Sequence, residues 1–141
     1  MDESPTLRAF DDNLNRLGLD QVDLYLMHWP PQSRDMVVDT WRAMIKIPAS
    51  GQARSIGVPN FAIQPHQRIL DEAGIMPTVN QVDLHPSFQQ VELRNFHKTR
   101  GATQSWNPLG VWRNLFPPLI DSAILSIAKK HGRTPAQIIM R

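Results

Sequence analysis

Four short apolar runs recur along the sequence at nearly regular spacing, and a helix-like segment separates each run from the next. The runs begin near positions 22, 53, 78 and 102, so successive starts are 31, 25 and 24 residues apart. This spacing suits βαβ units, because two parallel strands need a crossover of about a dozen residues or more. The runs are largely apolar, as strands are when helices cover a parallel sheet. The pattern predicts an α/β fold of about four βα units in a single domain spanning residues 1–141.

The local signals place the individual elements. Strands are expected at roughly 22–28, 53–58, 78–84 and 102–106. Helical periodicity and capping residues predict helices at 4–17, 37–45, 65–73, 90–99 and 120–131, with another starting at Thr134 and Pro135. Such a series fits either an open doubly wound sheet or part of a (β/α)8 barrel. A whole barrel takes roughly 250 residues, so in the second case this chain could hold only about half of one.

Composition excludes several functional classes. Fifteen basic residues against 13 acidic ones give a net charge of +2, and no basic run of five or more suggests a nucleic-acid partner. Cysteine is absent, which excludes disulfides, cysteine zinc sites and thiol nucleophiles and fits a reducing cytosol. The first residues are acidic and polar, unlike a signal peptide, and no apolar run approaches the roughly 20 residues of a membrane span. We expect a soluble cytoplasmic protein that binds neither nucleic acid nor a membrane.

Polar and aromatic residues follow the predicted strands, where ligands gather in both candidate architectures. This set comprises His28-Trp29, Pro59-Asn60-Phe61, Asn80-Gln81 with His85, and Trp106-Asn107. It offers hydrogen-bond donors, acceptors and flat aromatic faces but no obvious nucleophile. The set therefore suits the binding of a planar polar ring better than the hydrolysis of a bond. Amides and histidines at strand ends are also common in barrels where they have no function.

The remaining histidines have simpler interpretations. His66 and His97 lie in helical segments with polar neighbours, which predicts solvated faces, and His131 before Gly132 suits a helix C-terminus. His85 either reaches a substrate pocket or caps the end of a strand. No two histidines are spaced i, i+4, so we expect no metal site, and the GxGxxG and GxxxxGK[ST] phosphate motifs do not occur.

Four segments together resemble a known family. They are LGLDQVDLYLMHWP at 17–30, ARSIGVPNF at 53–61, VNQVDLHP at 79–86 and QSWNPLG at 104–110. In this order and spacing they closely resemble the aldo-keto reductases, and most of all the bacterial branch that includes 2,5-diketo-D-gluconate reductases. The resemblance runs from about Leu7 to Arg141.

The resemblance implies a (β/α)8 barrel that reduces aldehydes and ketones to alcohols with NADPH, NADH not being excluded, and without a metal. It places this chain over strands four to seven, a partial barrel whose open edges would favour self-association. In the family a Tyr protonates the carbonyl oxygen, Lys and Asp lower the pKa of that Tyr, and a His orients the carbonyl. Only the His has a match here, at His28. Tyr25, the single tyrosine, is expected to face the helices because it lies three residues from His28.

The cofactor residues match more fully. By resemblance, Asn60 and Gln81 bind the nicotinamide carboxamide and Trp106 stacks on the ring. The loop of Asn107, Leu109 and Gly110 follows the pyrophosphate, with Leu109 offering its backbone N–H. Trp29 lines the pocket for a small-molecule carbonyl substrate.

Three positions depart from the family pattern. Pro59 replaces a usual Ser, Asn107 a usual Ser or Gly, and Pro48 lies near the end of a helix that normally continues. We expect a chain derived from an NAD(P)H-dependent carbonyl reductase that is inactive as a fragment. The alternative is a non-catalytic truncated barrel, acting as a binding or regulatory fragment or arising from a disrupted gene.

Overall fold

The four predicted strands form one parallel sheet in the computed structural model, which describes residues 4–28, 34–110 and 118–141. Every neighbouring pair is parallel and the strand order follows the sequence. The strands are β1 (Val22–Leu26), β2 (Ala53–Pro59), β3 (Val79–Asp83) and β4 (Ala102–Trp106). The α/β expectation is confirmed, and each strand end lies within two residues of its predicted position.

The helices occupy the predicted intervals, with two additions, α3 and η2. They are α1 (Pro5–Leu17), α2 (Arg34–Met44), α3 (Lys46–Ala49), α4 (Ile63–Ala73), α5 (Val91–His97), η2 (Pro118–Ile120), α6 (Ser122–His131) and α7 (Pro135–Ile139). The second predicted helix ends at Met44, and α3 follows as a separate short turn that contains Pro48. Pro48 is tolerated there because N–H groups in the first helical turn have no intrahelical acceptor.

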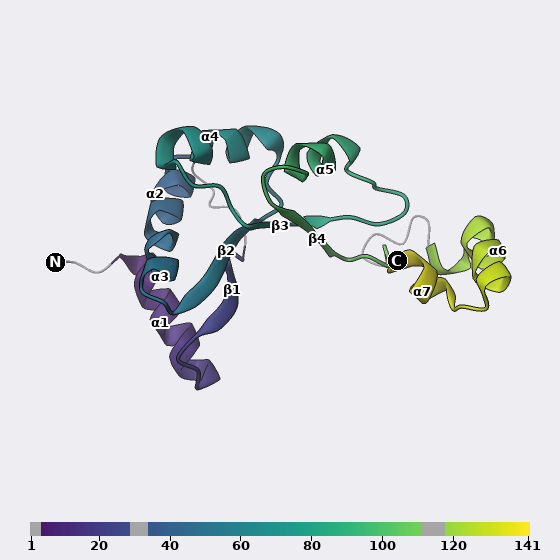
Figure 1. The fold of residues 1–141 in the computed structure, drawn as a ribbon, viewed down its shortest axis with the longest axis horizontal. Helices are drawn as coiled ribbons and strands as arrows, with labels where there is room; N and C mark the ends of the chain where they lie inside the picture. Colours follow the sequence, from purple (N-terminus) through teal and green to yellow (C-terminus); the bar gives the residue numbers. More distant parts are fainter. Residues whose placement is uncertain (1–3, 29–33, 111–117) are drawn as a thin grey trace.

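The main core lies between β1–β2 and the helices α1–α4, which cover one side of the sheet (Figure 1). Trp41 of α2, Val58 of β2 and Ile69 of α4 are each 0 % exposed. The indole Nε1–H of Trp41 donates to the carbonyl of Ile75 at 2.8 Å, so burial of this ring leaves no unpaired donor. The cluster around Trp41 is therefore the apolar interior between β1–β2 and their helices.

Strand alternation assigns the two faces of the sheet as predicted. Tyr25 packs against Phe10 of α1 with ring centroids 4.7 Å apart, and its hydroxyl accepts from Asn13 Nδ2 at 3.1 Å. The expectation that the only tyrosine faces the helices is confirmed. On the opposite face, a Cβ on Gly57 would lie 2.5 Å from Leu26 Cδ2 and 2.5 Å from the Val79 carbonyl oxygen. Only glycine fits between these neighbouring strands.

Two histidines expected on solvated faces are buried, and that prediction is wrong. His66 is 1 % exposed and His97 is 3 % exposed. His66 shares its helix face with buried Ile69, and His97 shares its face with buried Leu93, so both rings point under the helices rather than to solvent. Burial lowers the pKa of His66 to about 4, against an opposing hydrogen bond from its ring to Ala62, and burial also lowers the pKa of His97.

The C-terminal helices form a second, smaller unit at the far end of the molecule from α1 (Figure 1). Their principal contacts are with each other and with η2. Asp121 caps α6 by accepting from the N–H groups of Ala123 and Ile124, and Thr134 forms a capping box with Gln137 at the start of α7. The predicted helix start at Thr134 is confirmed.

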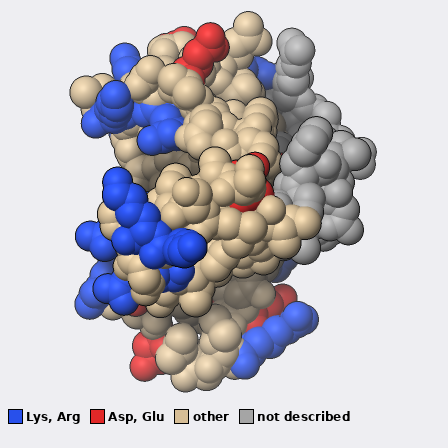
Figure 2. Space-filling view, turned by 90° about the vertical axis from the view of Figure 1, so that its right-hand side faces the viewer, with Lys and Arg blue, Asp and Glu red and all other residues tan. Residues whose placement is uncertain are grey.

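The surface of this end of the molecule is unevenly charged. Figure 2 shows Lys and Arg side chains gathered on one side of it. Lys129 and Lys130 belong to the last turn of α6, where positive charge suits the negative end of the helix dipole. Among residues 4–28, 34–110 and 118–141, no helix is long and apolar enough to cross a membrane.

Candidate functional site at the carboxyl ends of the strands

The sequence-predicted site residues lie at one edge of the sheet, because the carboxyl ends of parallel strands meet there. His28 is exposed and comes two residues after the end of β1. Trp29, predicted to line the substrate pocket, lies outside the described residues. The remaining predicted residues follow β2, β3 and β4.

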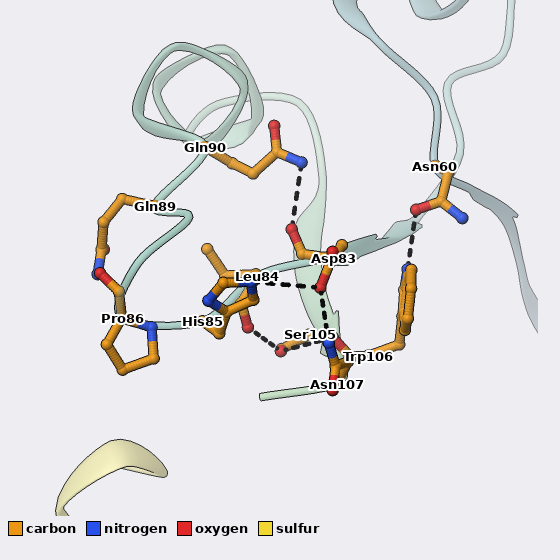
Figure 3. Close-up of polar contacts among 10 residues, drawn as sticks. All are labelled: Asn60, Asp83, Leu84, His85, Pro86, Gln89, Gln90, Ser105, Trp106 and Asn107. Atoms are coloured by element: carbon orange, nitrogen blue, oxygen red, sulfur yellow. Dashed lines mark hydrogen bonds and ion pairs between the residues drawn. The ribbon is translucent and has the colours of Figure 1, made fainter. Parts of the chain in front are cut away.

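Asn60, Gln81 and Trp106 come from three strands and are joined to one another by hydrogen bonds. The Trp106 Nε1–H donates to Asn60 Oδ1 at 2.8 Å (Figure 3). The Asn60 backbone N–H donates to the Gln81 carbonyl at 2.8 Å. Gln81 Nε2 also donates to Gln104 Oε1 at 3.1 Å. Hydrogen bonds therefore join the Asn60 side chain to the Trp106 indole and the Asn60 backbone to Gln81, at one edge of the sheet.

Asn60 has a left-handed backbone, with φ at 49°. This conformation is uncommon for residues other than glycine, and asparagine tolerates it better than most. The turn directs the chain away from the sheet immediately after Pro59 and leaves the Asn60 amide against the Trp106 indole (Figure 3). A specific backbone geometry therefore presents this amide.

The loop after β4 is held by side chains of the site. Asn107 also has a positive φ, of 56°, and its Nδ2 donates to Asp83 Oδ1 at 3.2 Å (Figure 3). Gly110 closes the turn through its N–H to the Asn107 carbonyl at 2.9 Å, with φ at 66°. A Cβ on Gly110 would lie 2.9 Å from Pro118 Cγ, so the close approach of η2 requires glycine. Leu109 lies half-buried in the same turn.

Asp83 is a site residue that the sequence analysis missed. Its carboxylate accepts from Asn107 and lies 3.9 Å from His85 Nε2, while its backbone carbonyl accepts from Gln90 Nε2 at 3.2 Å (Figure 3). The alternation of β3 could have identified it, because residues 81 and 83 share one face of the strand. Asp83 links the end of β3 to the loop that follows β4.

His85 closes the turn that follows β3. Its backbone pairs with Phe88 in both directions, at 3.3 and 2.9 Å, which supports the interpretation as a strand-end residue. Its ring approaches the Asp83 carboxylate through Nε2, and its Nδ1 is buried with no hydrogen-bond partner among residues 4–28, 34–110 and 118–141. Ser105 Oγ donates to the neighbouring Leu84 carbonyl at 2.6 Å, which fastens this turn to β4.

Asn80 does not belong to the ligand-facing set in which the sequence placed it. It is 2 % exposed and lies on the helix side of β3, with its amide hydrogen-bonded to the backbone of Phe61. Alternation explains the difference, since Gln81 faces the site and its neighbour must face the other way. Asn80 therefore lies behind the site.

Neither of the two best-defined clefts is formed by these residues. One, of about 650 Å³, lies between α6 and α7, and the other, of about 500 Å³, lies between the starts of α4 and α5. In the part of the chain that the structure describes, no group of three or more His, Cys, Asp or Glu side chains could hold a metal ion.

The sequence profile of the aldo/keto reductase family matches residues 2–110. This chain belongs to the aldo/keto reductase family. It is 45 % identical over 137 residues to an aldo-keto reductase of Mycolicibacterium smegmatis, a match that covers 96 % of this chain and 48 % of that protein. It is 43 % identical over 135 residues to methylglyoxal reductase DkgA of Escherichia coli, covering 94 % of this chain and 48 % of the relative. The resemblance seen in the four motifs is confirmed.

Solved structures of aldo/keto reductases agree with this assignment. The enzyme from Brucella melitensis superposes with a TM-score of 0.88 at 49 % identity, covering 96 % of this chain and 51 % of that one. A mutant of Gox0644 in complex with NADPH gives a TM-score of 0.87 at 45 % identity, covering 95 % and 48 %. The chain spans about half the length of the curated relatives it matches. The four-stranded sheet is accordingly part of a (β/α)8 barrel.

Two departures from the usual aldo/keto reductase pattern have structural explanations. Asn107 occupies a left-handed position at which glycine is also favoured, so it satisfies the same backbone requirement. Pro59 lies at the end of the β1–β2 ladder, whose last backbone hydrogen bond runs from the Met27 N–H to the Gly57 carbonyl at 3.2 Å. The next hydrogen bond would need an N–H from residue 59, which proline lacks.

Proposed function

We propose that this chain forms the nicotinamide-binding side of an NADPH-dependent reductase of aldehydes and ketones. The observation that carries the proposal is the convergence of Asn60, Gln81 and Trp106 from three strands at one edge. Side-chain amides both donate and accept, as a carboxamide requires, and an indole offers a flat face to a heteroaromatic ring. Membership of the family and a structural neighbour in complex with NADPH support the choice of cofactor, without excluding NADH.

The chemistry of these donors fits a nicotinamide cofactor. Asn60 and Gln81 would hold the carboxamide and Trp106 the ring face. The turn of Asn107, Leu109 and Gly110 would follow the pyrophosphate, with the Leu109 N–H as a donor. The nicotinamide supplies the hydride for carbonyl reduction.

The substrate side of the proposal rests on His28 and Trp29. His28 lies beyond the end of β1 at the same edge as the amides and would orient the carbonyl oxygen by hydrogen bonding. Trp29 would line the pocket. Because a relative that is 43 % identical is a methylglyoxal reductase, small α-dicarbonyl compounds are the first substrates to test.

The chain alone is not expected to turn over at a useful rate. Reduction builds negative charge on the carbonyl oxygen, and a proton donor must meet that charge in the transition state. The hydroxyl of Tyr25, the only tyrosine, is on the helix side of the sheet and accepts from Asn13. Loss of general acid catalysis typically costs about 10²–10⁴-fold in rate.

Two measurements on the purified chain test this proposal. NADPH titration followed by tryptophan fluorescence should show weak binding, with Kd in the range of about 1 mM, or roughly −4 kcal/mol. Trp106→Ala should abolish it, whereas Trp41→Phe, in the distant core, serves as a matched control and should not. NADPH absorbance with methylglyoxal and other carbonyls should show no turnover above background. Robust turnover that disappears in His28→Ala would contradict the proposed absence of a proton donor.

We also propose self-association of this chain and a cytoplasmic location. Strands β1 and β4 are the edges of the described sheet, and unpaired strand edges favour pairing with another chain. Sedimentation velocity measures this directly, and a monodisperse monomer at high concentration would contradict it. The cytoplasmic assignment rests on the cysteine-free composition, and fractionation of cells that express the chain tests it.

A further inference from the structure

Three polar side chains, the buried Asn80 and His97 and the half-buried Thr103, form a relay of contacts behind the candidate site. The relay ends at the turn that carries Asn60. Asn80 holds the backbone of Phe61 with both ends of its amide: Oδ1 accepts from the Phe61 N–H at 3.2 Å, and Nδ2 donates to the Phe61 carbonyl at 2.8 Å. The same Nδ2 lies 3.5 Å from His97 Nε2. His97 Nδ1 in turn lies 2.7 Å from Thr103 Oγ1.

The hydrogen-bond donors and acceptors of this relay match in only one protonation state of the His97 ring. Asn80 Nδ2 has two hydrogens, of which one goes to Phe61, so its contact with His97 requires an unprotonated Nε2. A neutral imidazole then carries its proton on Nδ1, which donates to Thr103 Oγ1. Burial of the ring favours the same neutral form, since it lowers the pKa of His97. The relay therefore runs from Thr103 on β4 through α5 and β3 to the turn after β2.

This relay holds the backbone of Phe61 at the point where the hydrogen bonding between β2 and β3 ends. After Asn60 donates to Gln81, the chain turns out of the sheet with a left-handed residue at position 60. The Asn80 amide pairs with Phe61 much as a neighbouring strand would pair with it, one residue beyond that turn. Because Asn80 is 2 % exposed, water does not compete for these hydrogen bonds.

We infer that Asn80 and His97 are positioning residues: their buried relay to Thr103 fixes the Asn60–Phe61 turn and so sets the Asn60 amide against the Trp106 indole. The expected effect of the relay on cofactor binding rests on the proposed function, whereas its effect on the geometry of the turn does not. The relay touches none of the reacting groups and acts through Asn60.

The test uses the indole N–H groups of the ¹⁵N-labelled chain as local probes. Trp106 donates to Asn60 and reports the turn, whereas Trp41 donates to Ile75 in the main core and reports global stability. Trp106→Phe and Trp41→Phe assign the two resonances. His97→Leu removes the acceptor for Asn80 and the donor for Thr103. It should shift the Trp106 resonance and speed its hydrogen exchange about tenfold, as expected for loss of one buried hydrogen bond.

Two further variants keep the test decisive. Thr103→Val breaks the far end of the relay with little change in shape and should give a smaller shift of the same sign, even where His97→Leu fails to fold. His97→Gln can accept from Asn80 and donate to Thr103, so it should restore the Trp106 signal. An unchanged Trp106 resonance in His97→Leu, or equal acceleration of exchange at Trp41 and Trp106, would overturn the positioning role.

NADPH titrations of the same variants separate this inference from the proposed function. The relay variants should weaken binding about tenfold, with recovery in His97→Gln. If the unaltered chain binds no NADPH, the proposed function fails, while the Trp106 resonance still decides whether the relay fixes the turn. If NADPH binds equally well in all variants although the Trp106 signal moves, the relay does not position the cofactor amide.

Discussion

The helices α1–α4 and the helices α6–α7 are stabilised in different ways. The first group packs on β1 and β2, where Trp41, Val58 and Ile69, which are distant in sequence, are fully buried. The second group has good caps, yet Leu125 of α6 is 45 % exposed and Ile120 of η2 is 70 % exposed. Side-chain caps therefore suffice to start α6 and α7, whereas an apolar core forms where helices pack on the sheet. The two regions should respond differently to the same kind of substitution.

The largest difference is expected for removal of a large apolar side chain. Trp41→Ala leaves a cavity in the main core and an unpaired Ile75 carbonyl, and should lower the free energy of unfolding by about 4 kcal/mol. Leu125→Ala, in the half-exposed face of α6, should lower it by less than about 1 kcal/mol. Urea denaturation followed by circular dichroism measures both. Equal losses would show that α6 shares the cooperative core.

A smaller contrast is expected on acidification. In the folded chain, burial lowers the pKa of His66 to about 4 and also lowers the pKa of His97. In the unfolded chain both rings have the ordinary pKa of 6.5, so they begin to bind protons at a pH where the folded rings are still neutral. The stability that depends on neutral rings is fully present above about pH 6.5 and is lost as the pH falls towards 4. For His66 alone the free energy of unfolding should fall by about 3 kcal/mol.

Urea midpoints at several pH values between 7 and 4 measure this loss. His66→Phe should flatten the pH profile because the buried titrating ring is gone. His131→Gln, at the exposed end of α6, is the matched control from the other region and should keep the steep loss of stability that His66 causes. A profile that stays steep in His66→Phe would assign the acid sensitivity to other groups.

The smallest effect is expected from a helix cap. Thr134→Ala removes the hydroxyl that accepts from the Gln137 N–H at 3.2 Å and should cost about 1 kcal/mol locally. Because α7 packs mainly on α6 and η2, the loss should appear as faster amide exchange in α7 and not as a lower urea midpoint for the main core. Thr134→Ser should retain slow exchange. A lower midpoint for the whole chain would mean that the two regions unfold together.

Much of the fold was accessible from the sequence because its strands are apolar runs bounded by clear breaks. The same regularity located Asn60, Gln81 and Trp106 at one edge of the sheet. It also placed Tyr25 on the face of the sheet that packs against the helices. The burial of His66 and His97 was missed because polar neighbours were weighed above helical spacing. Ile69 lies three residues after His66 and Leu93 four residues before His97, so the apolar stripe already contained the signal.

Other features depend on geometry that the sequence does not carry. The left-handed turns at Asn60 and Asn107 arise from the way the chain leaves β2 and β4, and either residue also fits ordinary backbone conformations. The alternation of β3 places Asp83 on the same face as Gln81, but a single carboxylate in a strand has no motif that predicts its contacts. Its contacts with Asn107 and His85 exist only once β3 and β4 are paired. The roles of the site residues in binding remain proposals that the titrations above address.

Pro59 interrupts the backbone hydrogen bonding between β1 and β2 at the edge that carries the candidate site. Because it cannot donate to β1, the segments that carry His28 and Asn60 can separate at that level without breaking a backbone hydrogen bond between the strands. On the other side of Asn60, its backbone is bonded to Gln81 and its side chain to Trp106. Both of these hydrogen bonds of Asn60 therefore run towards β3 and β4, on the side away from β1.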